Sequence, residues 1–462
     1  MTSLAPAPAV GENASNKATE LQTLLKHAGT VLAGQLAVMA YSVTDTIVAG
    51  RYSADSLAAL SVGSAVYVSV FVAMLSVVQA LLPLWAQMHG AQRPQDIGPS
   101  LRQALYLCGI TAALGMAVLF NCGPVFEWTS IPVGLRAEAQ TYLEVLAWSM
   151  PPALLFRMYS TLNQSLGKPR LVTWLQIGSL LVKIPLSIWF CFGGLGLSGH
   201  GAVGCAVASL VVNYLLLAVA MWMLKTHSLY QPLQIWQGME VPHWPQIASF
   251  ARLGVPSALA VVVEVTSFTL MALFVARLGT VASASHQIAT NLTALLYMVP
   301  LALAIAASAR VGFWLGAQNA DMVRRTVKLG IATVLTSSTL LAGLLLLGRR
   351  QLALIYSPNP DIIALAVPLL AWVALYHLAD GVQTMCLFLL RCFGIAMSPF
   401  VVYCLLLWGA GLGGGYVLAY QGWANGPALQ SPVAFWMTSA LALVATALVF
   451  CAMLWQVMRR RI

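Results

Sequence analysis

The sequence predicts an all-α membrane protein with twelve transmembrane helices in two six-helix lobes, related by a pseudo-two-fold axis along the membrane normal. Three observations predict this fold class: the composition, the lengths of the apolar runs and a repeat between the two halves. Hydrophobic residues make up 60% of the 462 residues and charged residues 8%, whereas soluble domains contain roughly 45–50% and about 25%. With a mean hydropathy of +0.83, too few polar residues remain to cover a water-soluble surface.

The apolar runs are long enough to cross a bilayer, since a helix needs about 20 apolar residues to span roughly 30 Å of hydrocarbon. They do not alternate between apolar and polar residues as barrel strands do, so each run is expected to be a helix. Twelve runs of this kind occur, at residues 28–49, 57–87, 103–123, 139–162, 171–192, 202–224, 250–276, 285–315, 327–347, 362–390, 399–419 and 433–457.

Polar segments divide these spans into domains. The first 27 residues lack the basic start, short apolar core and cleavage site of a signal peptide, so we expect a cytoplasmic tail there. The longest polar interruption lies near the middle of the chain and is expected to be a linker. The predicted domains are a tail at 1–27, an N-terminal lobe at 28–224, a cytoplasmic linker at 225–249, a C-terminal lobe at 250–458 and a basic cytoplasmic tail at 459–462.

The distribution of Lys and Arg predicts which side of the membrane each loop faces, because cytoplasmic loops are enriched in these residues. With the N-terminus inside, seventeen of the 23 Lys and Arg residues, Arg157 and Arg391 among them, fall on the cytoplasmic side and five on the other. Both termini are therefore expected in the cytoplasm. The basic residues are scattered singly, so the net charge of +10 does not indicate nucleic-acid binding.

The two halves resemble each other when one is shifted along the other by 226 residues. This shift places Arg51 on Arg277, and Gly90-Ala91-Gln92 on Gly316-Ala317-Gln318. Because each half has an even number of predicted spans, the two repeats share one topology and their symmetry axis runs along the membrane normal. Repeats of this kind are typical of transporters whose binding site lies between two moving lobes.

Four ionisable residues lie within the predicted spans, and these are Asp45, Lys183, Glu264 and Asp380. A charge at the centre of a membrane helix costs about 2.5–3.5 kcal/mol even on the most lenient scale, so such residues usually line pathways or cavities. The alternative interpretation is a buried ion pair that fixes the packing of the helices.

The predicted tenth span carries the densest polar cluster. Tyr376, Asp380 and Gln383 are spaced to lie on one face of a helix. Carboxylates beside hydroxyl and amide oxygens provide ligands suited to Na⁺, or a carboxyl group that exchanges a proton. The candidate residues for an ion or substrate cavity are Gln287, Thr290, Asn291 and Gln383, although hydrogen bonding between packed helices would also explain them singly.

Motifs of soluble catalysis and of metal binding are absent from the sequence. The eight cysteines form no CxxC pair, the seven histidines form no HExxH motif, and no Gly-x-Ser-x-Gly elbow occurs. We therefore expect no enzyme, no cofactor and no metal beyond a transported Na⁺ at Glu264 and Asp380. We also expect no obligatory protein partner.

Several motifs together resemble the multidrug and toxic compound extrusion (MATE) transporters, in particular their NorM-type bacterial branch. The first-span segment from Thr44 to Arg51 contains Asp45, and Gly254-Val255-Pro256 leads to Glu264 in the seventh span. His286-Gln287-Ile288-Ala289 follows, and Tyr376, Asp380 and Gln383 resemble the tenth-span motif. The resemblance covers roughly residues 28–455.

The resemblance implies an antiporter in the bacterial inner membrane that exports amphipathic, mostly cationic organic compounds and drugs by alternating access. Inward movement of Na⁺ or H⁺ would drive export. The family's cation-binding carboxylates carry over to Glu264 and Asp380 with Tyr376 beside them, and its first-span aspartate to Asp45. The alternative is a flippase for a lipid-linked saccharide or another lipid precursor. Flippases of the same superfold tend to have cationic cavities. Here Lys183 is the one basic residue placed at mid-span, compared with three acidic residues, which disfavours a flippase.

The sequence departs from the family in the fifth span, where asparagines are common and this chain has Lys183 and Ser187. Spans one and five are close in the family, so the resemblance predicts that Asp45 and Lys183 form an N-lobe polar pair. A lysine ammonium there would repel a bound Na⁺ and could take its place. We therefore expect Glu264, Asp380 and Tyr376 to carry the coupling.

Overall fold

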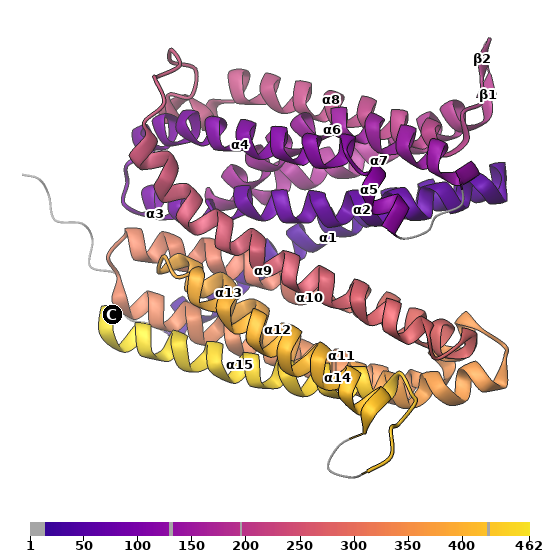
Figure 1. Ribbon diagram of the computed structural model, residues 1–462. Helices are drawn as coiled ribbons and strands as arrows, with labels where there is room; N and C mark the ends of the chain where they lie inside the picture. Colours follow the sequence, from indigo (N-terminus) through magenta and orange to yellow (C-terminus); the bar gives the residue numbers. More distant parts are fainter. Residues whose placement is uncertain (1–13, 129–132, 195, 423–425) are drawn as a thin grey trace, which may run out of the picture.

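The computed structural model describes residues 14–128, 133–194, 196–422 and 426–462, which fold into two helical lobes joined by a short linker (Figure 1). The N-terminal lobe and linker contain α1 (Ala14–Tyr52), α2 (Ala54–Gln79), α3 (Leu82–Gly90), the 3₁₀ helix η1 (Pro94–Asp96), α4 (Ile97–Phe120), α5 (Gly123–Trp128), α6 (Val133–Ser165), α7 (Pro169–Phe192), the hairpin strands β1 (Gly193–Gly194) and β2 (Leu197–Ser198), α8 (Gly201–Thr226) and the 3₁₀ helix η2 (Ser228–Leu233).

The C-terminal lobe follows the same plan. It contains α9 (Trp244–Ala276), α10 (Thr280–Gly316), α11 (Ala320–Tyr356), α12 (Pro360–Cys392), α13 (Met397–Tyr403), the π-helix η3 (Cys404–Gly413), α14 (Gly414–Tyr416), the π-helix η4 (Val417–Gln421) and α15 (Val433–Arg461). Each lobe has its own core of buried apolar side chains.

In the described part of the chain, eleven helical segments are long and apolar enough to cross a membrane. The predicted span 139–162 lies within α6, which is 33 residues long but contains Glu144, Arg157 and two internal prolines that lower its hydropathy. With α6 counted, the twelve-helix fold is complete. The first helix starts earlier than predicted, because α1 begins at Ala14 and residues 14–27, expected as tail, are helical.

The repeat is visible in the backbone at the turns after α3 and α10. Gln92 has φ 57° and Gln318 has φ 54°, a left-handed conformation that is rare for residues other than glycine. In both turns the following amide closes the end of the helix, with Arg93 donating to the Met88 carbonyl and Asn319 to the Trp314 carbonyl, each at 3.1 Å. The two halves thus use the same turn 226 residues apart.

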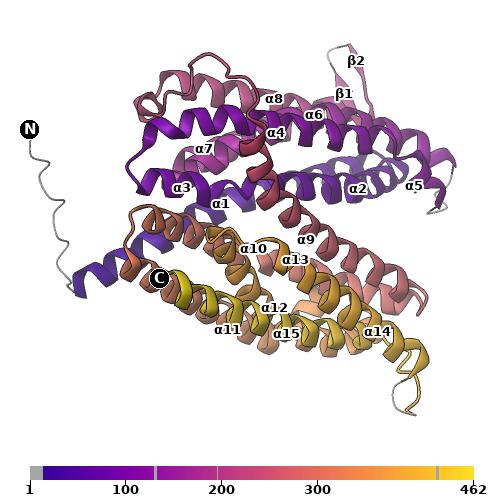
Figure 2. The ribbon, with the colours of Figure 1, turned by 60° about the vertical axis from the view of Figure 1, so that its left-hand side comes forward.

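The lobes contact each other at the end of the molecule that carries the linker, the start of α1 and the end of α15, here named the linker end (Figures 1 and 2). Gly90 packs on the backbone of Phe313, and Gly316 packs on the backbone of Gln87. A Cβ atom at either glycine would collide with those backbones, so the close approach requires glycine. These two contacts exchange under the 226-residue shift and therefore lie around the pseudo-two-fold axis.

A second connection between the lobes comes from the start of α1. The Glu20 carboxylate is buried and pairs with Arg310 of α10, with N–O distances of 2.5 and 2.9 Å. Trp314 and Thr326 also donate hydrogen bonds to it. Farther along, α1 packs on α7 of its own lobe. This unbroken helix of 39 residues therefore contacts both lobes.

Candidate functional site

The N-terminal lobe brings Asp45 of α1 and Lys183 of α7 together. The Lys183 ammonium lies 2.7 Å from the Asp45 carboxylate, so the predicted contact is present. Ser187, one turn after Lys183, donates a hydrogen bond of 3.0 Å to the same carboxylate. Lys183 is fully buried, and an ion pair in such a place is stable only when its remaining polar atoms find partners.

Those partners are supplied by α8. The Lys183 ammonium donates to the Cys205 carbonyl at 2.9 Å and to the Ser209 hydroxyl at 2.8 Å. Together with Asp45, these oxygens use all three donors that an ammonium has. The lysine nitrogen thus lies inside a set of oxygens much as a bound metal cation would.

A cavity of about 180 Å³ lies beside this pair. Its lining includes Asp45, aromatic side chains such as Tyr41 and Tyr67, and Arg157 of α6. The charge distribution suggested that Arg157 belongs to the cytoplasmic side, whereas its guanidinium faces this cavity and donates to Gln35 of α1 at 3.5 Å. The N-terminal cavity is therefore lined by one carboxylate, Asp45, and one cation, Arg157, and Lys183 pairs with that carboxylate from outside the lining.

The C-terminal lobe brings Glu264 of α9 and Asp380 of α12 close enough to interact electrostatically. Asp380 is 2% exposed and accepts a hydrogen bond of 2.9 Å from Gln383, which lies on the same helix face as the spacing predicted. Neither acid forms an ion pair with any residue that the structure describes. This lobe thus holds two carboxyl groups in its interior without a bonded cation.

Tyr376 lies in an aromatic cluster next to Glu264. Its ring makes edge contacts with Phe268 of α9 at 5.8 Å and with Trp436 of α15 at 5.7 Å, measured between ring centroids. A cavity of about 20 Å³ is lined by Glu264, Ser267 and Tyr376 among others. It provides room for one ion or water molecule beside the Glu264 carboxylate.

Three further residues around the two acids were not identified from the sequence. Arg391, counted as a cytoplasmic basic residue, is 4% exposed and interacts electrostatically with Glu264. Tyr297 of α10 faces both acids, and Tyr403 of α13 donates a hydrogen bond to Gln383. The periodicity of the spans gives no signal for these contacts, since each joins two different helices.

In the described part of the chain, the three candidates on α10 form no hydrogen bond with Glu264 or Asp380, and they have two different surroundings. Gln287 and Asn291 are exposed, and the Gln287 amide donates to the Asn291 oxygen at 3.0 Å. Thr290 donates to the backbone carbonyl of His286 at 3.0 Å, and the His286 ring in turn accepts from Trp436. Thr290 is thus linked through His286 and Trp436 to the aromatic cluster around Tyr376. Gln287 and Asn291 instead bond each other on the exposed side of α10.

The π-helical segment η3 borders the site. Its Trp408 indole donates to the carbonyl of Val263, the residue before Glu264, at 3.1 Å, and Leu407 lines the small cavity. A π-turn leaves some backbone groups of a helix in unusual register, and such turns are frequent at functional sites. The arrangement fixes the backbone of α9 directly beside Glu264.

Known proteins provide an independent comparison. The MatE family model matches residues 31–189 and 256–417. The probable multidrug resistance protein NorM of Aromatoleum aromaticum is 35% identical over 438 residues, which cover 95% of this chain and 94% of the relative. The multidrug resistance protein MdtK of Yersinia pseudotuberculosis is 32% identical over 430 residues, covering 93% and 94%.

Solved structures share the fold. The eukaryotic MATE transporter AtDTX14 superposes with a TM-score of 0.86 at 17% identity, covering 96% of this chain and 98% of that one. The Vibrio cholerae MATE transporter VcmN in the bent form gives a TM-score of 0.82 at 16% identity, with coverage of 96% and 98%. Because the family model matches most of the chain and the relatives align with it over nearly its full length, this chain is an integral membrane protein of the MatE family, on its NorM-type bacterial branch.

Proposed function

We propose that this chain is a cation-coupled antiporter that exports amphipathic, mostly cationic organic compounds and drugs by alternating access, driven by Na⁺ or H⁺. The named relatives are multidrug resistance proteins, which supports drug export and does not favour the flippase alternative. The protein would act as a transporter rather than an enzyme, with no cofactor and no obligatory protein partner.

The observation that carries the proposal is the pair of carboxyl groups, Glu264 and Asp380, without an ion-paired cation among the described residues. Two acids that face each other in a protein interior cannot both stay charged without a counterion. They therefore accept either a proton or a Na⁺ ion, and the small cavity beside Glu264 gives such an ion a place. Release of that ion leaves negative charge that attracts an organic cation.

Alternating access requires the lobes to separate where they now meet. We propose that the linker end is the cytoplasmic end in a bacterial inner membrane, with both termini inside. The contacts of Gly90 with Phe313 and of Gly316 with Gln87 would then close the cytoplasmic side in this state. Binding of the coupling ion and binding of the substrate would favour opposite arrangements of the lobes. Inward movement of the ion would therefore drive outward movement of the substrate across the membrane.

The orientation is tested by labelling. A cysteine introduced at Ser357, after α11, should react with a membrane-impermeant thiol reagent added to intact cells. A cysteine at Gly238 in the linker should react only after the membrane is opened. The reverse pattern would overturn the proposed orientation.

Coupling is tested in proteoliposomes loaded with a fluorescent organic cation. Efflux is measured under an imposed Na⁺ gradient and, separately, under an imposed proton gradient, for the parent protein and for Glu264→Gln. We expect one gradient to drive efflux and Glu264→Gln to abolish it. Glu144→Gln is the matched control, because Glu144 is exposed on α6 and, among the described residues, bonds only Gln140. Equal efflux with and without both gradients would refute ion coupling.

A further inference from the structure

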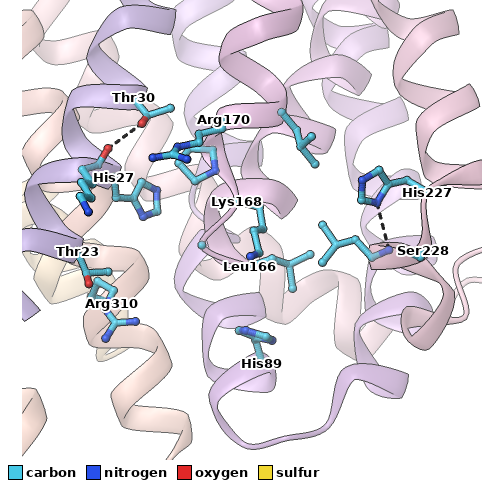
Figure 3. Close-up of a pocket in the computed structure, with 15 residues that line it drawn as sticks. Thr23, His27, Thr30, His89, Leu166, Lys168, Arg170, His227, Ser228 and Arg310 are labelled. Atoms are coloured by element: carbon cyan, nitrogen blue, oxygen red, sulfur yellow. Dashed lines mark hydrogen bonds between the residues drawn. The ribbon is translucent and has the colours of Figure 1, made fainter. Parts of the chain in front are cut away.

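A cavity of about 790 Å³ lies at the linker end (Figure 3), and neither Glu264 nor Asp380 is among its lining residues. Its walls come from the start of α1, the end of α3, the turn between α6 and α7, the start of η2 and the end of α10. Figure 3 shows side chains from these elements converging on one space. A volume of this size is typical of sites that bind small organic molecules.

The lining is strongly basic. It includes Lys26, Lys168, Arg170 and Arg310, and no Asp or Glu is among the lining residues. Glu20 pairs with Arg310, but the other three form no ion pair with any described residue. Lys168 and Arg310 also interact electrostatically with the ring of His89. Positive charges that line a concave surface raise the local concentration of anions.

Two further features point to a specific ligand. His27 of α1 is 6% exposed and lines the cavity, and its Nε2 atom has no hydrogen-bond partner among the described residues. A buried ring nitrogen without a partner is unfavourable unless a ligand or water supplies one. The start of α7, a helix of 24 residues, also lines the cavity, and Lys168 at its N-cap makes no side-chain capping bond. The free amide groups at the N-terminus of α7 and the dipole of this helix favour an anion in the part of the cavity next to them.

We propose that this cavity binds a phosphate group, carried either by an anionic phospholipid or by a soluble phosphate compound. Tetrahedral oxygens suit the combination of guanidinium, ammonium, imidazole and helix amides found on its walls. Lys168 and Arg170 belong to the N-terminal lobe, whereas Lys26 lies on the part of α1 that Glu20 ties to Arg310 of the C-terminal lobe. A bound phosphate group therefore links the two lobes where they meet.

The test measures the melting temperature of purified, delipidated protein in a neutral detergent, with no ion gradient and no drug. One arm adds dioleoylphosphatidylglycerol in mixed micelles, with dioleoylphosphatidylcholine as its reference. The other arm adds inorganic phosphate, with chloride at equal ionic strength as its reference. A shift with the anionic lipid alone identifies a headgroup as the ligand, and a shift with inorganic phosphate alone identifies a soluble phosphate compound. No shift in either arm would overturn the proposal.

Variants locate the site. Lys168→Gln/Arg170→Gln removes charge from the N-terminal wall, and we expect at least a tenfold weaker apparent affinity. Lys26→Gln, on the other wall, should weaken binding as well; unchanged affinity would refute the link between lobes. The control pair Arg349→Gln/Arg350→Gln removes the same number of positive charges near the C-terminus of α11, outside the lining of the cavity, and should leave affinity unchanged. Equal losses in both pairs would reduce the effect to net charge. Because the measurement involves no transport, the proposal of a phosphate-binding site would stand even if the proposed export function failed its own test.

Discussion

The two lobes have matching cavities but place their acids on different helix turns. The 226-residue shift relates Asp45 to Met271 and Glu264 to Val38. Met271 lines the C-terminal cavity beside Glu264, and Val38 lines the N-terminal cavity beside Asp45. The repeated fold thus places a cavity of about 180 Å³ and one of about 20 Å³ at corresponding positions, while the charged residues that line them differ.

The difference lies in what neutralises the acids. Asp45 is paired with Lys183, a cation fixed by a covalent chain and held by three oxygen atoms. Glu264 and Asp380 form no ion pair with any described residue, and Arg391 interacts with Glu264 without pairing with it. On the proposed function, the counterion of these two acids comes from solution. The two lobes thus differ in whether the cation beside the acid belongs to the chain, as Lys183 does in the N-terminal lobe.

The largest expected effect is on stability and comes from the N-terminal pair. Lys183→Ala leaves the Asp45 carboxylate buried without a partner, and breaking a buried pair in this way costs about 3–5 kcal/mol. The double variant Lys183→Ala/Asp45→Asn removes both charges and should recover much of that loss. Unfolding of the purified proteins in denaturant would measure both. A double variant no more stable than the single one would contradict the ion-pair interpretation.

The second prediction concerns cation binding by the purified protein, measured by calorimetry. Glu264→Gln should weaken binding of the coupling ion at least a hundredfold, or about 2.7 kcal/mol. The N-terminal variant Asp45→Asn/Lys183→Gln should leave it within a factor of two or so, since that lobe already contains its own cation. If binding is lost in the second variant and kept in the first, the assignment of the lobes is reversed.

The third prediction concerns transport by the C-terminal acids. Asp380→Asn preserves the shape of the side chain and its hydrogen bond with Gln383 but removes the charge. We expect normal insertion and folding with efflux of a fluorescent cation reduced at least tenfold, which corresponds to about 1.4 kcal/mol. Asp361→Asn is the matched control, because that aspartate is exposed in the first turn of the same helix. Near-normal efflux by Asp380→Asn would assign this residue to packing.

The smallest expected effect concerns how the N-terminal lobe is tied to the linker. Arg102 of α4 bonds Glu240 of the linker at 2.5 Å, and this hydrogen bond holds the pKa of Glu240 below its ordinary value of 4.5. The pair therefore stabilises the fold above pH 4.5 and loses this contribution as pH falls through the lowered pKa. Because Glu240 is half-exposed, Glu240→Gln should lower stability by less than about 1 kcal/mol. Melting curves at neutral and acidic pH should differ between parent and variant only at neutral pH.

Much of the fold was predictable because apolar runs report directly on burial in lipid. The exception, α6, is long enough to span a membrane, but its charged residues and its two prolines lower its hydropathy. The pairing of Asp45 with Lys183 was predicted from the close approach of spans one and five in the resembling family, together with two opposite charges at mid-span. The common face of Asp380 and Gln383 was predictable because it depends only on helical spacing.

The rest depended on contacts between different helices. Arg391 looked like a loop cation because it ends an apolar run, yet it is buried near Glu264. Glu20 looked like part of a polar tail, although its partners on α10 and α11 draw it into the interface. Tyr297 and Tyr403 are indistinguishable in the sequence from other aromatic residues of a span. Local periodicity contains no information about such partners.

The contact of Glu20 with Arg310 has a consequence for biosynthesis, because 290 positions separate the two residues. A ribosome adding about 5–20 residues per second needs roughly 15–60 seconds to pass from one to the other. Throughout that interval the first helix is already made while its salt-bridge partner does not yet exist. The start of α1 therefore reaches its final packing only after α10, the second helix of the C-terminal lobe, has been translated.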